Sequence, residues 1–235
     1  MKILDYLFPK QCLNCLEFGE YLCKSCESSN IERNIKQYCH VCKEGIDRGP
    51  IHAAGPALSA YLVHPECVKQ TSLDGVIVCC KYNKTVERLI AEIKYNFYTD
   101  IVNYILPYYN HGLKELQLSL KQLVIVPIPL HKRKQKTRGF NQAELIAKRL
   151  ANGQLFAYQN LLIRNKNTKT QVGMSRGDRI ENLKNVFEIV AKNNLPSRVV
   201  LIDDIMTTGT TLEECSKLLK KNGVKEVFGL VFARG

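Results

Sequence analysis

VVLIDDIMTTGTT, residues 199–211, is the stretch of the chain that decides its fold. Its first four residues are wholly apolar, which is typical of a strand buried on both faces of a parallel sheet. Asp203 and Asp204 follow at the carboxyl end of this strand, where open α/β sheets bind their ligands. Thr207 to Thr211 then begin a helix, so the pattern is a strand, a loop and a helix.

The polar half of this stretch has the groups that a sugar phosphate requires. Small residues let backbone N–H groups approach a phosphate, hydroxyls add donors, and the helix dipole favours an anion. Two carboxylates would repel a ligand that consists of phosphate alone. They can, however, accept hydrogen bonds from the vicinal hydroxyls of a ribose. Because successive strand residues point to opposite sides, Asp203 and Asp204 cannot have identical roles. The alternative is that Asp203 caps the turn and the threonines form an ordinary N-cap region.

The pattern of the chain from residue 71 to residue 235 predicts one α/β domain. Continuous apolar strands separated by helices indicate a parallel sheet that is covered on both faces. Apolar runs and helical periodicity predict strands at 75–82, 123–126, 161–163, 199–202 and 227–232, and helices at 85–95, 100–116, 141–150 and 210–221.

A basic run follows the strand at 123–126. Residues 131–138 read HKRKQKTR, and Pro127 and Pro129 stiffen the segment before them. We interpret this run as a loop whose cations bind a diphosphate or a nucleic-acid backbone, with a merely solvated loop as the alternative. Its candidate ligands are Lys132, Arg133, Lys134, Lys136 and Arg138.

The charge of the chain is uneven. The net charge is +12. Residues 1–70 carry eight basic and eight acidic side chains, whereas residues 71–235 carry 26 basic and 14 acidic ones. Such an excess favours a polyanionic partner, although a simply soluble basic surface would have the same composition.

The composition also bears on location. No run approaches the ~18–20 uninterrupted apolar residues of a membrane span. The first residues, MKILDYLFPK, lack the features of a secretory signal, and they predict a short helix over residues 1–11 that packs on the protein itself. We therefore expect a cytoplasmic protein.

Seven of the ten cysteines precede residue 70, in a polar segment that needs staples to fold. Disulfides are typical of exported domains, so metal ligation is favoured here. Three CxxC pairs and the similar His64-Pro65-Glu66-Cys67 supply eight ligands, enough for two structural Zn²⁺ ions. Both a consecutive and an interleaved pairing are compatible with the spacing of Cys12, Cys15, Cys23, Cys26, Cys39, Cys42, His64 and Cys67.

Several motifs together resemble the ComF family, the competence-associated branch of phosphoribosyltransferase-like proteins. Residues 199–211 resemble the phosphoribosyl-diphosphate signature of type I phosphoribosyltransferases over its full length. The other matching residues are PIPL at 127–130, RGFNQ at 138–142, Gln171, Arg179 and Asn182, and the N-terminal cysteine pairs.

The resemblance implies a type I phosphoribosyltransferase-like parallel sheet flanked by helices over residues 71–235. A double zinc-ribbon-like module would precede it over residues 1–70. Asp203 and Asp204 would hold the ribose hydroxyls, and Mg²⁺ would accompany the ligand's diphosphate. The 5-phosphate would be held by Thr207, Thr208, Gly209, Thr210 and Thr211.

The implied function is phosphoribosyl-diphosphate binding, with a role in DNA uptake through single-stranded DNA and the uptake machinery. A phosphoribosyltransferase that acts on a nitrogenous acceptor is the enzymatic alternative, and a non-catalytic ligand sensor is a third. We assign no catalytic residue, because no side chain stands out as a general base for an acceptor.

Two further segments carry weaker hypotheses. Residues 164–182 are polar, and Arg176, Arg179 and Asn182 would share one helical face if Ser175 caps a helix. An exposed loop is the alternative. The tyrosine-rich residues 95–109 offer stacking platforms for nucleobases, with core packing as the alternative.

Overall fold

The computed structural model describes residues 9–33, 37–46, 62–96, 98–119, 122–152, 156–165, 186–190 and 194–235. The predicted helix over residues 1–11 falls mostly outside these residues. So do the predictions for Gln171, Ser175, Arg176, Arg179 and Asn182. Within the described parts of the chain, no helix has both the length and the apolar character needed to cross a membrane.

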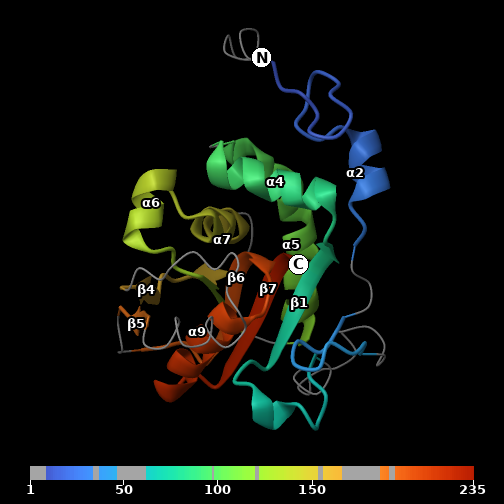
Figure 1. The fold of residues 1–235 in the computed structure, drawn as a ribbon. Helices are drawn as coiled ribbons and strands as arrows, with labels where there is room; N and C mark the ends of the chain where they lie inside the picture. The colour runs from blue at the N-terminus through green and yellow to red at the C-terminus, as the bar shows by residue number, and fades with distance from the viewer. Residues whose placement is uncertain are drawn as a thin grey trace.

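A parallel sheet of five strands forms the centre of the molecule (Figure 1). All neighbouring strands in it run parallel, as the apolar runs predict. The strand that precedes the acid pair is longer than expected, because it continues through both aspartates. In spatial order the strands are β1 (Gly75–Lys81), β7 (Glu226–Arg234), β6 (Arg198–Met206), β2 (Leu123–Pro127) and β3 (Ala157–Tyr158).

Helices cover both faces of this sheet, and each face has its own apolar core. One core joins the sheet to α4 (Lys84–Tyr95), α5 (Val102–Ser119) and α7 (Gln142–Asn152). The other joins the opposite face to α9 (Thr210–Lys221). Shorter helices complete the described chain: α2 (Lys24–Asn30), α6 (Lys132–Arg138), η2 (Val68–Gln70) and η3 (Thr99–Ile101).

One predicted strand lies outside the main sheet. The strand expected at 161–163 is β4 (Leu162–Arg164), and it pairs antiparallel with β5 (Phe187–Ile189). β3 takes the place beside β2. Leu162 and Phe187 are buried in the core on the α9 face. The small β4–β5 sheet therefore stands over α9, next to the sheet rather than within it.

The basic run is a helix, so its interpretation as a loop is wrong. His131 caps the start of α6, where its Nδ1 accepts a hydrogen bond of 3.2 Å from the backbone N–H of Arg133. Lysine, arginine and glutamine are good helix formers, and Gly139 ends the helix in the left-handed conformation at φ 71°. The helix has no buried side chain, so the run lacks the apolar periodicity by which a helix is usually predicted.

The outer edge of β1 is covered by the segment that joins the cysteine pairs. Arg33 forms an antiparallel β-bridge with Cys80, and the backbone N–H of Lys81 donates to Glu32 O at 2.9 Å. Further along, the side chain of Gln37 accepts from the N–H of Val78 at 3.0 Å. An uncovered edge strand is a template for aggregation, and this segment protects it.

Candidate functional site

A cavity of about 380 Å³ opens at the carboxyl ends of β2 and β6. Its volume lies in the range of small-ligand pockets. The two strands are neighbours, so residues distant in sequence converge there. All seven residues predicted to bind the sugar phosphate line this cavity, and so do Lys134 and Arg138 of the basic run.

The threonine loop forms one wall of the cavity. Gly209 adopts φ 79°, ψ −2° and is the N-cap of α9, without a side-chain hydrogen bond to the first turn. Thr208 Oγ1 accepts from the backbone N–H of Thr210 at 3.4 Å, so a threonine also contacts the first turn of the helix. Thr208 Oγ1 and Thr210 Oγ1 lie 2.8 Å apart. The start of α9 thus offers backbone donors and hydroxyls to an anion.

The two aspartates differ in environment, as the strand geometry predicts. Asp204 is almost fully buried, whereas Asp203 is half-buried in the cavity wall. Burial and the neighbouring charge of Asp204 raise the pKa of Asp203 to about 8. Below that pH, Asp203 holds a proton until a cation or hydroxyl donors stabilise its charge.

Lys94 is the partner of Asp204, and the sequence reasoning missed it. Its Nζ lies 2.6 Å from Asp204 Oδ2. Burial lowers the pKa of Lys94, but Asp204 outweighs burial, and the pKa lies above its ordinary value. A signal was present in the sequence: Val86, Ile90 and Lys94 are spaced by four residues, so the lysine continues the buried face of α4.

The RGFNQ motif is mainly structural. Asn141 donates to Ile128 O at 2.9 Å and accepts from the N–H of Ala143 at 3.1 Å, which fixes the loop and caps α7. Gln142 lies 3.4 Å from Asp204 Oδ2 and receives a 3.3 Å hydrogen bond from Arg138. The motif therefore connects the basic helix to the acid pair.

The basic helix divides its charges between the cavity and the solvent. Lys134 and Arg138 are half-buried and line the cavity, whereas Lys132, Arg133 and Lys136 are exposed and do not. Burial lowers the pKa of Lys134, and the nearby positive charges of Arg164 and Arg138 lower it further. Such crowded cations favour an anionic ligand.

Three more residues line the cavity that were not among the predicted site residues. Arg164, at the end of β4, lines the cavity and stacks on Phe187 with 5.5 Å between its Cζ and the ring centroid. Tyr82 and Tyr95 stand at its wall, and both are exposed. Arg138 lies 5.1 Å from the ring centroid of Tyr95. Arg164 and Tyr95 begin the two segments that carry the weaker hypotheses, whereas no motif marked Tyr82.

The structure brings the cysteine pairs together consecutively. Cys12, Cys15, Cys23 and Cys26 form one cluster, and the second is Cys39, Cys42, His64 and Cys67; in each, the ligand atoms lie within 4.8 Å of one another. Tetrahedral Zn²⁺ with bonds of about 2.3 Å separates its sulfurs by about 3.8 Å. Cys15 Sγ and Cys23 Sγ lie 3.6 Å apart. Both clusters could hold zinc.

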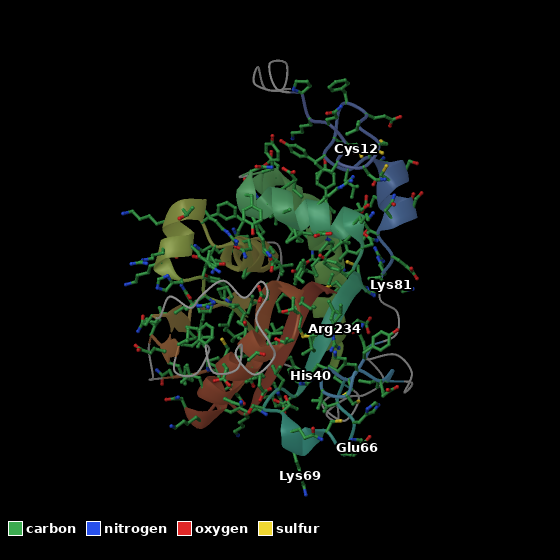
Figure 2. All side chains as sticks on the ribbon, viewed as in Figure 1. Cys12, His40, Glu66, Lys69, Lys81 and Arg234 are labelled. Atoms are coloured by element: carbon green, nitrogen blue, oxygen red, sulfur yellow. The ribbon has the colours of Figure 1, made fainter. Side chains whose placement is uncertain are left out.

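The two clusters lie far apart, as Cys12 and Glu66 show in Figure 2. The first packs on α4, where Arg88 donates to Leu13 O at 3.1 Å and Thr85 donates to Asn14 at 3.2 Å. Near the second, half-buried His40 lies 2.8 Å from Thr71 Oγ1. Thr71 in turn donates to Glu213 of α9 at 2.6 Å.

The remaining cysteines and tyrosines are mostly core residues. Cys79, Cys80 and Cys215 are buried, as expected. Tyr108 and Tyr109 are buried as well, and Tyr109 donates a 2.6 Å hydrogen bond to Asp203 O at the end of β6. In the tyrosine-rich segment the exposed rings are Tyr95 and Tyr98.

Comparison with known proteins identifies the family of the chain. The family model described as "Phosphoribosyl transferase domain" matches residues 114–234, just over half of the chain. Competence protein F of Haemophilus influenzae is 35% identical over 222 residues, which cover 90% of this chain and 96% of that protein. This chain belongs to the ComF family.

Two other relatives widen the comparison. The DNA utilization protein YhgH of Escherichia coli K12 is 28% identical to this ComF-family chain over 232 residues, 93% of this chain and 94% of that protein. Competence protein ComFC of Bacillus subtilis is 31% identical over 144 residues, 60% of this chain and 56% of that protein.

The different environments of the two aspartates predict opposite effects on stability. Asp203→Asn should raise Tm, because it removes a carboxyl group that burial and a like charge disfavour. The unfolded chain releases this proton above about pH 4, whereas the folded protein holds it to about pH 8. The wild type therefore loses stability as pH rises through this window, and the advantage of the variant should grow from pH 5 to pH 8.

Asp204→Asn is the matched variant and should lower stability by about 3–5 kcal/mol, because Lys94 loses its buried counter-ion. Thermal unfolding by circular dichroism at several pH values measures both. Equal shifts in the same direction for the two variants would contradict the assigned environments.

Proposed function

We propose that this protein binds phosphoribosyl diphosphate with Mg²⁺ in the cavity at the ends of β2 and β6. The observation that carries the proposal is the convergence of three groups on one cavity. An acid pair, a threonine loop at a helix start and the inward cations of the basic helix all line it. A diol, a phosphate and a diphosphate are the matching parts of one ligand.

Each part of the ligand has a counterpart of suitable chemistry. Asp203 and Asp204 would accept hydrogen bonds from the ribose hydroxyls, and residues 207–211 would surround the 5-phosphate. Lys134 and Arg138 would neutralise the diphosphate, together with Mg²⁺. The match of the chain to the phosphoribosyl transferase domain supports this arrangement. Turnover with a nitrogenous acceptor uses the same donor site, and an acceptor screen with diphosphate release as its readout tests it.

Titration calorimetry with phosphoribosyl diphosphate and Mg²⁺ tests the binding site. Asp203→Asn should weaken binding roughly tenfold to a hundredfold, because a carboxylate acceptor contributes about 1.5–3 kcal/mol per hydrogen bond. Asp100→Asn is the matched control, because Asp100 pairs with Lys10 outside the cavity. Binding that is absent in the wild type, or equal in both variants, would contradict the proposed site.

The two cysteine clusters are proposed to hold one structural Zn²⁺ each, in a module that covers residues 1–70 and precedes the transferase-like domain of residues 71–235. Four sulfur ligands would close the first tetrahedron, and three sulfurs with one nitrogen the second, so the ions would stabilise the fold without a catalytic position. The side-chain amide of Asn14 donates a hydrogen bond of 3.6 Å to Cys26 Sγ. Contacts of this kind, outside the metal's own ligands, orient a thiolate.

Native mass spectrometry should find two zinc ions per chain. Cys23→Ser should lose one ion and keep the other, and Cys42→Ser should do the same for the other cluster. Cys215→Ala should retain both, because Cys215 is buried in the apolar core. If either serine variant lost both ions, the two sites would not be independent.

The proposed cellular role is the handling of single-stranded DNA during DNA uptake, in the cytoplasm and with the uptake machinery. Relatives named for competence and DNA utilization support it. The structure adds a surface of suitable chemistry, because exposed cations of α6 lie beside the cavity and the exposed ring of Tyr95 stands at its wall. Aromatic stacking combined with basic side chains is the usual way of binding single strands.

Tyr95→Ala should weaken binding of an oligothymidine by about 1–3 kcal/mol, the value of one base stacked on an aromatic ring. Tyr38→Ala is the control, because Tyr38 is exposed beside the second cysteine cluster. Fluorescence anisotropy at several salt concentrations measures both. Lys132→Gln should reduce the salt dependence, and binding without any salt dependence would exclude a contact with the phosphate backbone.

A further inference from the structure

The acid pair of the cavity already has a cation of its own. Lys94 reaches it from the last turn of α4, with 2.6 Å between Nζ and Asp204 Oδ2. The lysine side chain is 20% exposed and the aspartate side chain 6% exposed, so water screens this pair poorly. Both residues line the proposed ligand cavity.

Both acceptor positions of Asp204 Oδ2 are occupied in this arrangement, whereas Oδ1 has one occupied. Its Oδ1 accepts the backbone N–H of Ile205 at 2.7 Å. Its Oδ2 accepts from Lys94 and, at 3.4 Å, from Gln142. A ribose hydroxyl that donates to Asp204 Oδ2 therefore competes with the ammonium group for that oxygen.

A displaced Lys94 requires a new anion. A largely buried ammonium without a partner is costly, and the positive charge of Arg138 opposes any movement towards the basic helix. The hydroxyls of a ribose 5-phosphate would bind the Asp204 carboxylate and leave Lys94 without an anionic partner. A ribose that also carries a diphosphate on C1 would replace one anion with another.

We propose that Lys94 is a specificity-determining residue, whose pairing with Asp204 makes the cavity favour a ribose phosphate that carries a diphosphate over one that lacks it. The inference rests on the proposed binding of phosphoribosyl diphosphate. In the ligand-free protein Lys94 neutralises Asp204. In the complex the ribose hydroxyls take its place, and the ammonium group moves to the diphosphate.

Titration calorimetry with Mg²⁺ against phosphoribosyl diphosphate and against ribose 5-phosphate tests this. The wild type should prefer the diphosphate ligand. Lys94→Met should weaken binding of that ligand about tenfold, through loss of one charge-assisted contact, and strengthen binding of ribose 5-phosphate. Lys94→Arg should retain the preference, because it keeps the charge. Lys148→Met is the control: Lys148 pairs with Glu144 and does not line the cavity.

The outcomes separate this inference from the function on which it rests. No binding of either ligand by the wild type would reject the proposed function. Equal affinity of the wild type for the two ligands would overturn the inference even if Lys94→Met did not fold. Binding by the wild type with an unchanged ratio of affinities in a folded Lys94→Met protein would also overturn the specificity role and leave the function intact. A folded variant is recognised by its thermal unfolding transition.

Discussion

The geometry of the cavity depends on the ion pair between Lys94 and Asp204. Two adjacent carboxylates at the end of a buried strand repel each other, and burial increases that repulsion. Lys94 neutralises one of them, while the pKa of the other, Asp203, rises to about 8. The cation that α4 holds against Asp204 therefore stabilises the acid pair at the end of β6.

The cysteine-rich segment contacts α4 on one face of the sheet and is linked to α9 on the other. Asn14 and Leu13 of the first cluster contact α4 through Thr85 and Arg88. The second cluster is linked to α9 through His40, Thr71 and Glu213, one turn beyond the threonine loop. Each cluster thus supports one of the two helices that flank the cavity. Structural metal sites at these places would help to fix the acid pair and the threonine loop relative to each other, although neither cluster lines the cavity.

Local patterns predicted the central sheet and the contiguous parts of the site. Residues 199–211 form a strand, a loop and a helix because apolar burial and the start of a helix are local properties. Lys94 was missed because its role depends on a strand more than a hundred residues away, and only its spacing after Ile90 indicated burial. The basic run was misinterpreted because charge was given more weight than helix propensity. The pairing of the cysteines required the fold, since spacing allowed two arrangements.

The helical form of the basic run changes what its charges can do. A flexible loop could direct all five cations at one diphosphate. A helix of seven residues fixes them around its axis, so Lys134 and Arg138 face the cavity while Lys132, Arg133 and Lys136 face the solvent. Since the outward cations are held away from the cavity, a diphosphate there does not neutralise them. The five cations of this helix therefore divide between the proposed diphosphate site inside the cavity and the proposed DNA-binding surface outside it.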